Sequence, residues 1–128
     1  MHSTEEATRM RVLIVDDSRL ARVMLRKSLP PELLTDVVEA ADGNEALRCL
    51  ATSHVDLMLL DLTMPERDGY QVLKALNDSG GVPPTIVVSA DAQSLASERV
   101  MQLGAIGFVR KTFKPAELTE ILRRAGLV

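Results

Sequence analysis

Short apolar runs alternate with segments of helical spacing along the whole chain, and this alternation constrains the fold more than any other feature. The runs cover residues 12–15, 35–40, 55–60, 85–88 and 106–110. Strands that alternate with helices usually form a parallel sheet covered by helices on both faces. The almost continuous apolar character of residues 55–60 predicts the central, doubly covered strand. We therefore expect an α/β domain built on parallel strands.

Capping residues and prolines predict where the helices begin and end. We expect helices after Ser18, Asn44, Asp68 and Asp91, and a last one from Pro115. The pair Pro30-Pro31 should end the first helix, because proline removes a backbone donor. In that first helix the apolar positions predicted to face the core are Leu20, Val23, Met24 and Leu25.

Length and composition exclude several classes of protein. The chain has 128 residues, which suits one domain. A net charge of -3 and 2% aromatic residues argue against direct binding of nucleic acid, so we interpret the basic groups at Arg22, Arg26 and Lys27 as a solvated helix face. The apolar runs are too short to span a membrane, and the acidic start has no secretory signal, so a cytoplasmic location is expected.

Polar residues follow four of the apolar runs at the point where each run ends. Asp16 and Asp17 follow the first run, Asp61 the third, Ser89 the fourth, and Lys111 the last. Ligands of open parallel sheets bind outside the carboxyl ends of the strands. Each residue alone could be an ordinary cap, turn residue or solvated charge. Their common position predicts that all five meet at one edge of the sheet.

Three neighbouring carboxylates repel one another unless a proton or a divalent cation lies between them. Mg²⁺ is the expected cation, because it takes one or two carboxylates and leaves positions for water or phosphate oxygens. Lys111 could then contact one phosphoryl oxygen and Ser89 another, while Asp61 could attack phosphorus as a nucleophile.

The motifs together resemble the receiver domains of two-component response regulators, and specifically the free-standing chemotaxis-type, CheY-like receivers. They are the pair Asp16-Asp17, the stretch from Asp61 to Gly69, the pair Ser89-Ala90, and Phe108 three positions before Lys111. The resemblance implies a flavodoxin-like, doubly wound sheet of five parallel strands in the order 2-1-3-4-5, with five helices. We expect the receiver domain at residues 11–127, preceded by an N-terminal tail at residues 1–10.

The resemblance also implies a role for each site residue. Asp61 would accept a phosphoryl group from a histidine kinase or a histidine phosphotransfer protein. The Mg²⁺ ligands would be Asp16, Asp17, Asp61 and the backbone carbonyl of Thr63. Ser89 and Phe108 would act as switch residues that change the surface of the fourth helix, fifth strand and fifth helix. A downstream protein target is expected but not named, and the chain could be a monomer or a phosphorylation-dependent dimer.

Two departures from relatives lead to separate predictions. Phe108 stands where many relatives carry Tyr, and burying a phenyl ring leaves no hydroxyl unpaired, so an inward rotamer is expected even without phosphate. Relatives usually have proline directly after the active-site lysine, but here Thr112 follows Lys111. Because a cis bond before a residue other than proline costs about 2.5 to 4 kcal/mol, we expect this bond to be trans.

Three alternatives stay open at the level of sequence. The first is an aspartyl-nucleophile phosphohydrolase of the haloacid dehalogenase class, although that class has a second acid where this chain has Thr63. The second is a receiver-like docking scaffold that takes no phosphate. The third is a receiver cut from a longer regulator with an output domain. In the leading interpretation the chain is not an enzyme beyond its own phosphorylation and dephosphorylation.

Overall fold

The structure is a computed structural model that describes residues 10–34, 36–90 and 95–128. Its strands are β1 (Val12–Val15), β2 (Val37–Ala40), β3 (Leu57–Leu60), β4 (Thr85–Ser89) and β5 (Gly107–Arg110). They form one sheet in the order β2-β1-β3-β4-β5, and every neighbouring pair is parallel. Parallel strands in this order, within the described ranges, confirm the predicted strand topology.

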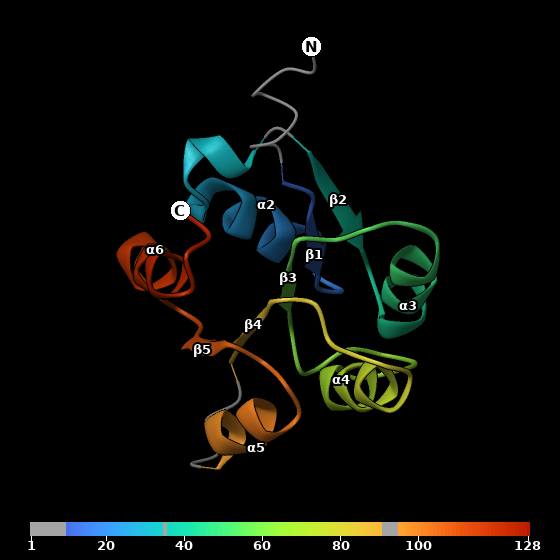
Figure 1. Ribbon diagram of the computed structural model, residues 1–128. Helices are drawn as coiled ribbons and strands as arrows, with labels where there is room; N and C mark the ends of the chain where they lie inside the picture. The colour runs from blue at the N-terminus through green and yellow to red at the C-terminus, as the bar shows by residue number, and fades with distance from the viewer. Residues whose placement is uncertain (1–9, 35, 91–94) are drawn as a thin grey trace.

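Helices cover both faces of the sheet, as Figure 1 shows. The described helices are α2 (Arg19–Ser28), α3 (Gly43–Thr52), α4 (Gly69–Asp78), α5 (Ala96–Gln102) and α6 (Pro115–Arg124), with a short 3-10 turn η1 (Pro31–Leu33) after α2. Helices α2 and α6 lie on one side, and α3, α4 and α5 lie on the other. The doubly wound, flavodoxin-like fold class is therefore confirmed.

The central strands separate two apolar layers. Leu57 and Leu59 of β3 point into the layer shared with α2 and α6, whereas Met58 and Leu60 point into the layer shared with α3, α4 and α5. All four side chains are fully buried. A strand that is apolar at every position therefore lies at the centre of the sheet, as the sequence predicted.

Side-chain caps mark where α2, α3 and α4 begin. Ser18 accepts a hydrogen bond from the backbone N–H of Ala21, and Asp68 forms a capping box with Gln71. The prediction that Asn44 caps the next helix was wrong by two residues. Asp42 is the cap, since its carboxylate accepts from the N–H of Glu45 at 2.8 Å. An ionised carboxylate accepts a backbone N–H more strongly than a neutral amide does.

The predicted inner face of α2 was also largely wrong. Leu20, Val23 and Met24 are 71%, 40% and 56% exposed, and only Leu25 of the four predicted residues is buried. Leu25 and Leu29, four positions apart, are the apolar residues that pack against the sheet. The neighbouring inward position, one turn earlier, is taken by the half-buried Arg22. The apolar periodicity therefore indicated an amphipathic helix, but the stripe predicted to face the core is adjacent to the one that is buried.

The bond between Lys111 and Thr112 is cis, so the expectation of a trans bond was wrong. That expectation used only the local preference of a peptide bond. The residues on either side of the bond have tertiary contacts that a local preference does not include: the N–H of Lys111 donates to the carbonyl of Ser89 at 2.9 Å, and Phe113 packs in the apolar layer shared with α2 and α6.

Within the described residues, the longest apolar helical stretches fall short of what a membrane-spanning helix needs.

Candidate functional site

The register between β1 and β3 brings two acids side by side. Val15 pairs with Leu60, so the residues that follow them, Asp16 and Asp61, leave the same edge of the sheet together. The N–H of Asp61 donates to the carbonyl of Val15 at 3.0 Å and fixes this alignment. With Asp17, each of these residues offers a carboxylate oxygen, and the three oxygens lie within 4.8 Å of one another.

Asp16 is fully buried and held at every polar atom. Its Oδ1 accepts from the backbone N–H of Ser18 at 2.9 Å, and its Oδ2 accepts from Nζ of Lys111 at 2.7 Å. Its N–H donates to the carbonyl of Ala40 at 3.1 Å, and its own carbonyl accepts from Nη1 of Arg22. A buried carboxylate requires this degree of pairing, because an unpaired charge in the interior is strongly unfavourable.

Asp61 is 6% exposed and sits beside two other negative charges. Burial, together with the charge of Asp16, raises the pKa of Asp61 from its ordinary 3.8 to about 6. The positive charge of Lys111 and a hydrogen bond from the backbone N–H of Thr63 act in the opposite direction. The carboxylate is therefore ionised near neutral pH but is less stable in that form than an ordinary surface aspartate.

Asp17 and Thr63 complete the edge from the solvent side. Both residues are exposed. The backbone N–H of Thr63 donates a hydrogen bond to the carboxylate of Asp61. The carbonyl of Thr63, the predicted cation ligand, lies in the same loop after β3. In the part of the chain that the structure describes, the Asp17 carboxylate takes part in no hydrogen bond or ion pair, so its position depends on the backbone that carries it.

Lys111 reaches into the acidic cluster from the loop after β5. Its Nζ lies 2.7 Å from Asp16 and 3.8 Å from Asp61. The side chain is 27% exposed, so this positive charge is partly removed from water. It offsets part of the repulsion among the acids.

Replacing Lys111 with methionine should tighten Mg²⁺ binding about fivefold, corresponding to about 1 kcal/mol, because the variant removes a positive charge that competes for Asp16. Mg²⁺ titrations of the two proteins followed by NMR would measure the change. Lys74→Met is a matched control, since Lys74 lies on α4 and pairs with Asp78 away from the cluster. Weaker binding in Lys111→Met than in Lys74→Met would contradict the prediction.

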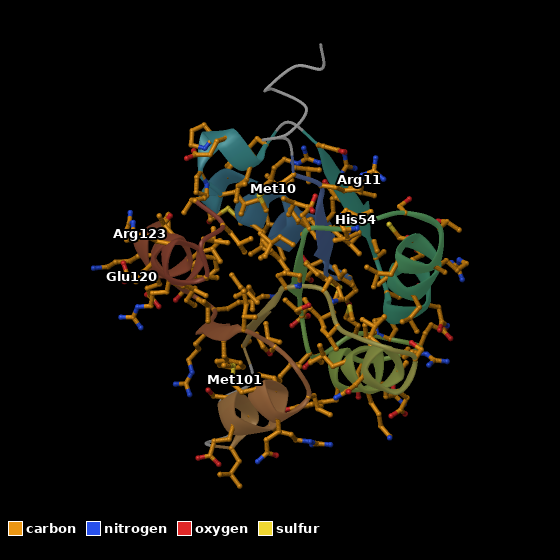
Figure 2. All side chains as sticks on the ribbon, viewed as in Figure 1. Met10, Arg11, His54, Met101, Glu120 and Arg123 are labelled. Carbon is orange, nitrogen blue, oxygen red and sulfur yellow. The ribbon has the colours of Figure 1, made fainter. Side chains whose placement is uncertain are left out.

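The structure places Ser89 at the predicted edge and Phe108 away from it. Ser89 is the last residue of β4 and is fully buried, and its carbonyl accepts from the N–H of Lys111. Phe108 is half-buried in β5, where it packs against the α3–α5 layer and also lines a groove of about 560 Å³ with Met101 and Ile121. Figure 2 shows Met101 on the side of α5 that faces β5. The inward rotamer of Phe108 stays a prediction.

Two residues near the site were not identified from the sequence. Arg22 had been interpreted as part of a solvated face, but its guanidinium contacts the main chain of Asp16. Gly69 had no assigned role, but its N–H donates to the carbonyl of Leu62 beside Asp61. The spacing of Arg22 three and seven positions before Leu25 and Leu29 was a signal that could have revealed it. Asp91, where the sequence predicted a helix start, lies outside the described residues.

The donor set fits a hard divalent cation. Carboxylate oxygens are the ligands that Mg²⁺ prefers, and three of them converge from two adjacent strand ends. Burial raises the pKa of Asp61 most, the charges of Asp16 and Asp17 raise it further, and the single positive charge of Lys111 lowers it only in part. A cation at this edge would offset the remaining repulsion between the carboxylates.

A five-stranded parallel sheet with an acidic cluster and a lysine at its carboxyl edge defines the class of receiver domains. In agreement, the family model for the response regulator receiver domain matches residues 12–123. The chain belongs to this family, and its function is that of a receiver domain in two-component signalling.

Curated relatives are longer than this chain. A protein-glutamate methylesterase/protein-glutamine glutaminase of Myxococcus xanthus is 42% identical over 104 residues, which cover 80% of this chain and 30% of the relative. The response regulator MprA of Mycobacterium ulcerans is 39% identical, over 89% of this chain and 49% of the relative. The chain spans half or less of the length of these relatives.

Solved structures of similar size share the whole fold. CheY of Borrelia burgdorferi, in a complex with CheX, BeF3 and Mg, has a TM-score of 0.82 and 27% identity, covering 91% of this chain and 89% of that one. A response regulator receiver protein of Pseudomonas putida has a TM-score of 0.80 and 30% identity, with coverages of 91% and 97%.

Proposed function

We propose that Asp61 is the phosphoacceptor of this receiver domain. The observation that supports this most directly is the position of its carboxylate, which is nearly buried at the end of the central strand β3 and lies 3.8 Å from Nζ of Lys111. A carboxylate held in this way can act as a nucleophile toward an electrophilic phosphorus that binds within its reach.

In the proposed reaction an oxygen of Asp61 attacks the phosphorus of a phosphohistidine on a histidine kinase or histidine phosphotransfer protein. A new P–O bond forms, the P–N bond breaks, and the imidazole leaves with the electron pair of that bond and takes up a proton. Lys111 stabilises negative charge on a phosphoryl oxygen, and Ser89 donates to another. Later attack by water on phosphorus releases phosphate and restores Asp61.

The proposed cation ligands are Asp16, Asp17, Asp61 and the carbonyl of Thr63. When bound, Mg²⁺ supplies positive charge to the phosphoryl oxygens. The contribution of the protein is to hold Asp16 buried, with its Oδ1 bonded to the backbone N–H of Ser18, so that its carboxylate has a fixed position before the cation arrives. The phosphorylated domain would signal through Ser89 and Phe108 to the surface formed by α5, β5 and α6, where an unidentified protein target binds.

The test is incubation of the protein with Mg²⁺ and acetyl phosphate or phosphoramidate, followed by intact mass spectrometry. The wild type should gain the mass of one phosphoryl group, and Asp61→Asn should gain none. Asp56→Asn is a suitable control, because Asp56 lies just before β3 at the opposite end of the same strand. Equal phosphorylation of Asp61→Asn and wild type would refute the assignment.

A phosphohydrolase remains the alternative to test, because it shares the nucleophile and the sheet. Thr63, an exposed residue two positions after Asp61, provides no second carboxylate for such a reaction. Steady turnover of a phosphate monoester would favour the hydrolase. The domain limits at residues 11–127, a cytoplasmic location, the oligomeric state and any output domain stay predictions.

A further inference from the structure

The guanidinium of Arg22 connects helix α2 to strand β2 and to the main chain of Asp16 at the acidic edge. Its Nε donates to Oε1 of Glu39 at 2.7 Å, and its Nη1 donates to the carbonyl of Asp16 at 2.5 Å. The side chain is only 15% exposed. Glu39, at the third position of β2, is itself held by Arg26, whose Nη2 donates to Oε2 at 2.9 Å. Arg22 is therefore oriented on one side by Glu39 and contacts main chain on the other.

The carbonyl that Arg22 contacts belongs to the peptide unit between Asp16 and Asp17. Because a peptide unit is planar, fixing its oxygen also fixes the direction in which the chain enters Asp17. The Asp17 carboxylate has no hydrogen bond or ion pair of its own among the described residues, although it lies within the 4.8 Å cluster of possible ligand oxygens. Its placement in that cluster therefore depends on the peptide unit that Arg22 holds.

We infer that Arg22 is a positioning residue for the divalent cation site, which acts by holding the Asp16–Asp17 peptide so that the Asp17 carboxylate faces Asp16 and Asp61. This inference rests on the proposed cation site. It assigns to Arg22 a role through the backbone, without contact to the cation. The carboxylates of Asp16 and Asp61 are also held by other groups, so the effect of Arg22 falls mainly on Asp17.

Removing the charge of Arg22 and removing its hydrogen bond to the Asp16 carbonyl should change cation affinity in opposite directions. Arg22 is a positive charge near an acidic site, so loss of the charge alone would tighten Mg²⁺ binding. Loss of the hold on the Asp16–Asp17 peptide would weaken it, since groups that orient metal ligands typically change affinity by about 10- to 100-fold. The sign of the change therefore separates the two explanations.

The experiment measures Mg²⁺ affinity by NMR titration for wild type, Arg22→Gln, Arg22→Lys and Arg26→Gln. Arg26→Gln is the matched control, because Arg26 lies on the same helix and donates to the same Glu39 but does not contact Asp16. Arg22→Lys keeps the charge but lacks the fork that reaches two acceptors at once, so any weakening in it comes from geometry. Urea unfolding in EDTA gives the stability of each variant separately.

The expected result is a Mg²⁺ dissociation constant raised about tenfold in Arg22→Gln and raised also in Arg22→Lys, with Arg26→Gln equal to or tighter than wild type. Unchanged or tighter binding in both Arg22 variants would overturn the inference while leaving the cation site intact. If the wild type itself binds no Mg²⁺, the proposed function fails instead.

Discussion

Replacing Asp61 with asparagine should stabilise the metal-free protein by about 3 kcal/mol at pH 8, because the variant removes a buried charge whose folded-state pKa is raised from 3.8 to about 6. Asparagine has nearly the same size, and its carbonyl can still accept the hydrogen bond from the N–H of Thr63. A more stable protein that cannot be phosphorylated would show that Asp61 is retained for chemistry at the expense of stability.

The pH dependence follows from the direction of the shift. Between pH 3.8 and 6 the folded protein binds more protons at Asp61 than the unfolded chain does, so the free energy of unfolding falls as the pH rises. The full difference between Asp61→Asn and wild type is therefore present above about pH 6 and vanishes below about pH 4. Urea unfolding in EDTA at several pH values would measure it.

Asp78→Asn controls for a general change in net charge, because Asp78 is exposed at the end of α4. Saturating Mg²⁺ should stabilise the wild type more than Asp61→Asn and so reduce the difference between them. A wild type that is more stable than Asp61→Asn in EDTA at pH 8 would contradict the prediction.

Gly69→Ala is expected to destabilise the protein by about 2 to 3 kcal/mol, because this first residue of α4 packs directly on main chain. A Cβ there would overlap the carbonyl oxygen of Asp61 and lie 2.9 Å from Cα of Leu62. Neither group can move by changing a rotamer, so the helix terminus or the end of β3 must shift. Phosphorylation by acetyl phosphate should slow by about 10- to 100-fold, since small displacements of reacting groups reduce rates steeply.

Thermal or urea unfolding and the rate of mass gain with acetyl phosphate would check both effects. Gly80→Ala separates the overlap from backbone strain: Gly80 has a φ of 121° and nothing within 4 Å of an added Cβ. That control should lose about 1 to 2 kcal/mol but keep the phosphorylation rate. Equal phosphorylation rates for Gly69→Ala and wild type would contradict a direct connection between α4 and the site.

The acidic edge was predictable from the sequence because the end of each apolar run indicates where a strand ends. Asp16 and Asp61 each follow an apolar run by one position, and parallel pairing of Val15 with Leu60 then places them together. Ser89 and Lys111 followed from the same reasoning, and the fold from the alternation of strands and helices. These features depend on period and order along the chain, which the sequence contains directly.

Other features were not predictable because they depend on rotation or on contacts between distant residues. Leu20 and Leu25 lie on one amphipathic helix, and only packing against the sheet decides which of them is buried. The hold of Arg22 on Asp16 requires Glu39, which comes from another strand. The cis bond after Lys111 runs against the local preference of a bond before a residue other than proline, and that preference was all that the sequence offered.

Helix α4 contacts the main chain at the end of β3 directly, and this contact affects how a displacement at Asp61 would be transmitted to the helix. Many helices rest on a sheet through side chains, which absorb small displacements by turning about their own bonds. The first residue of α4 has no such side chain, and its N–H bonds to the main chain one residue after Asp61. A shift of the backbone there would therefore carry the start of α4 with it.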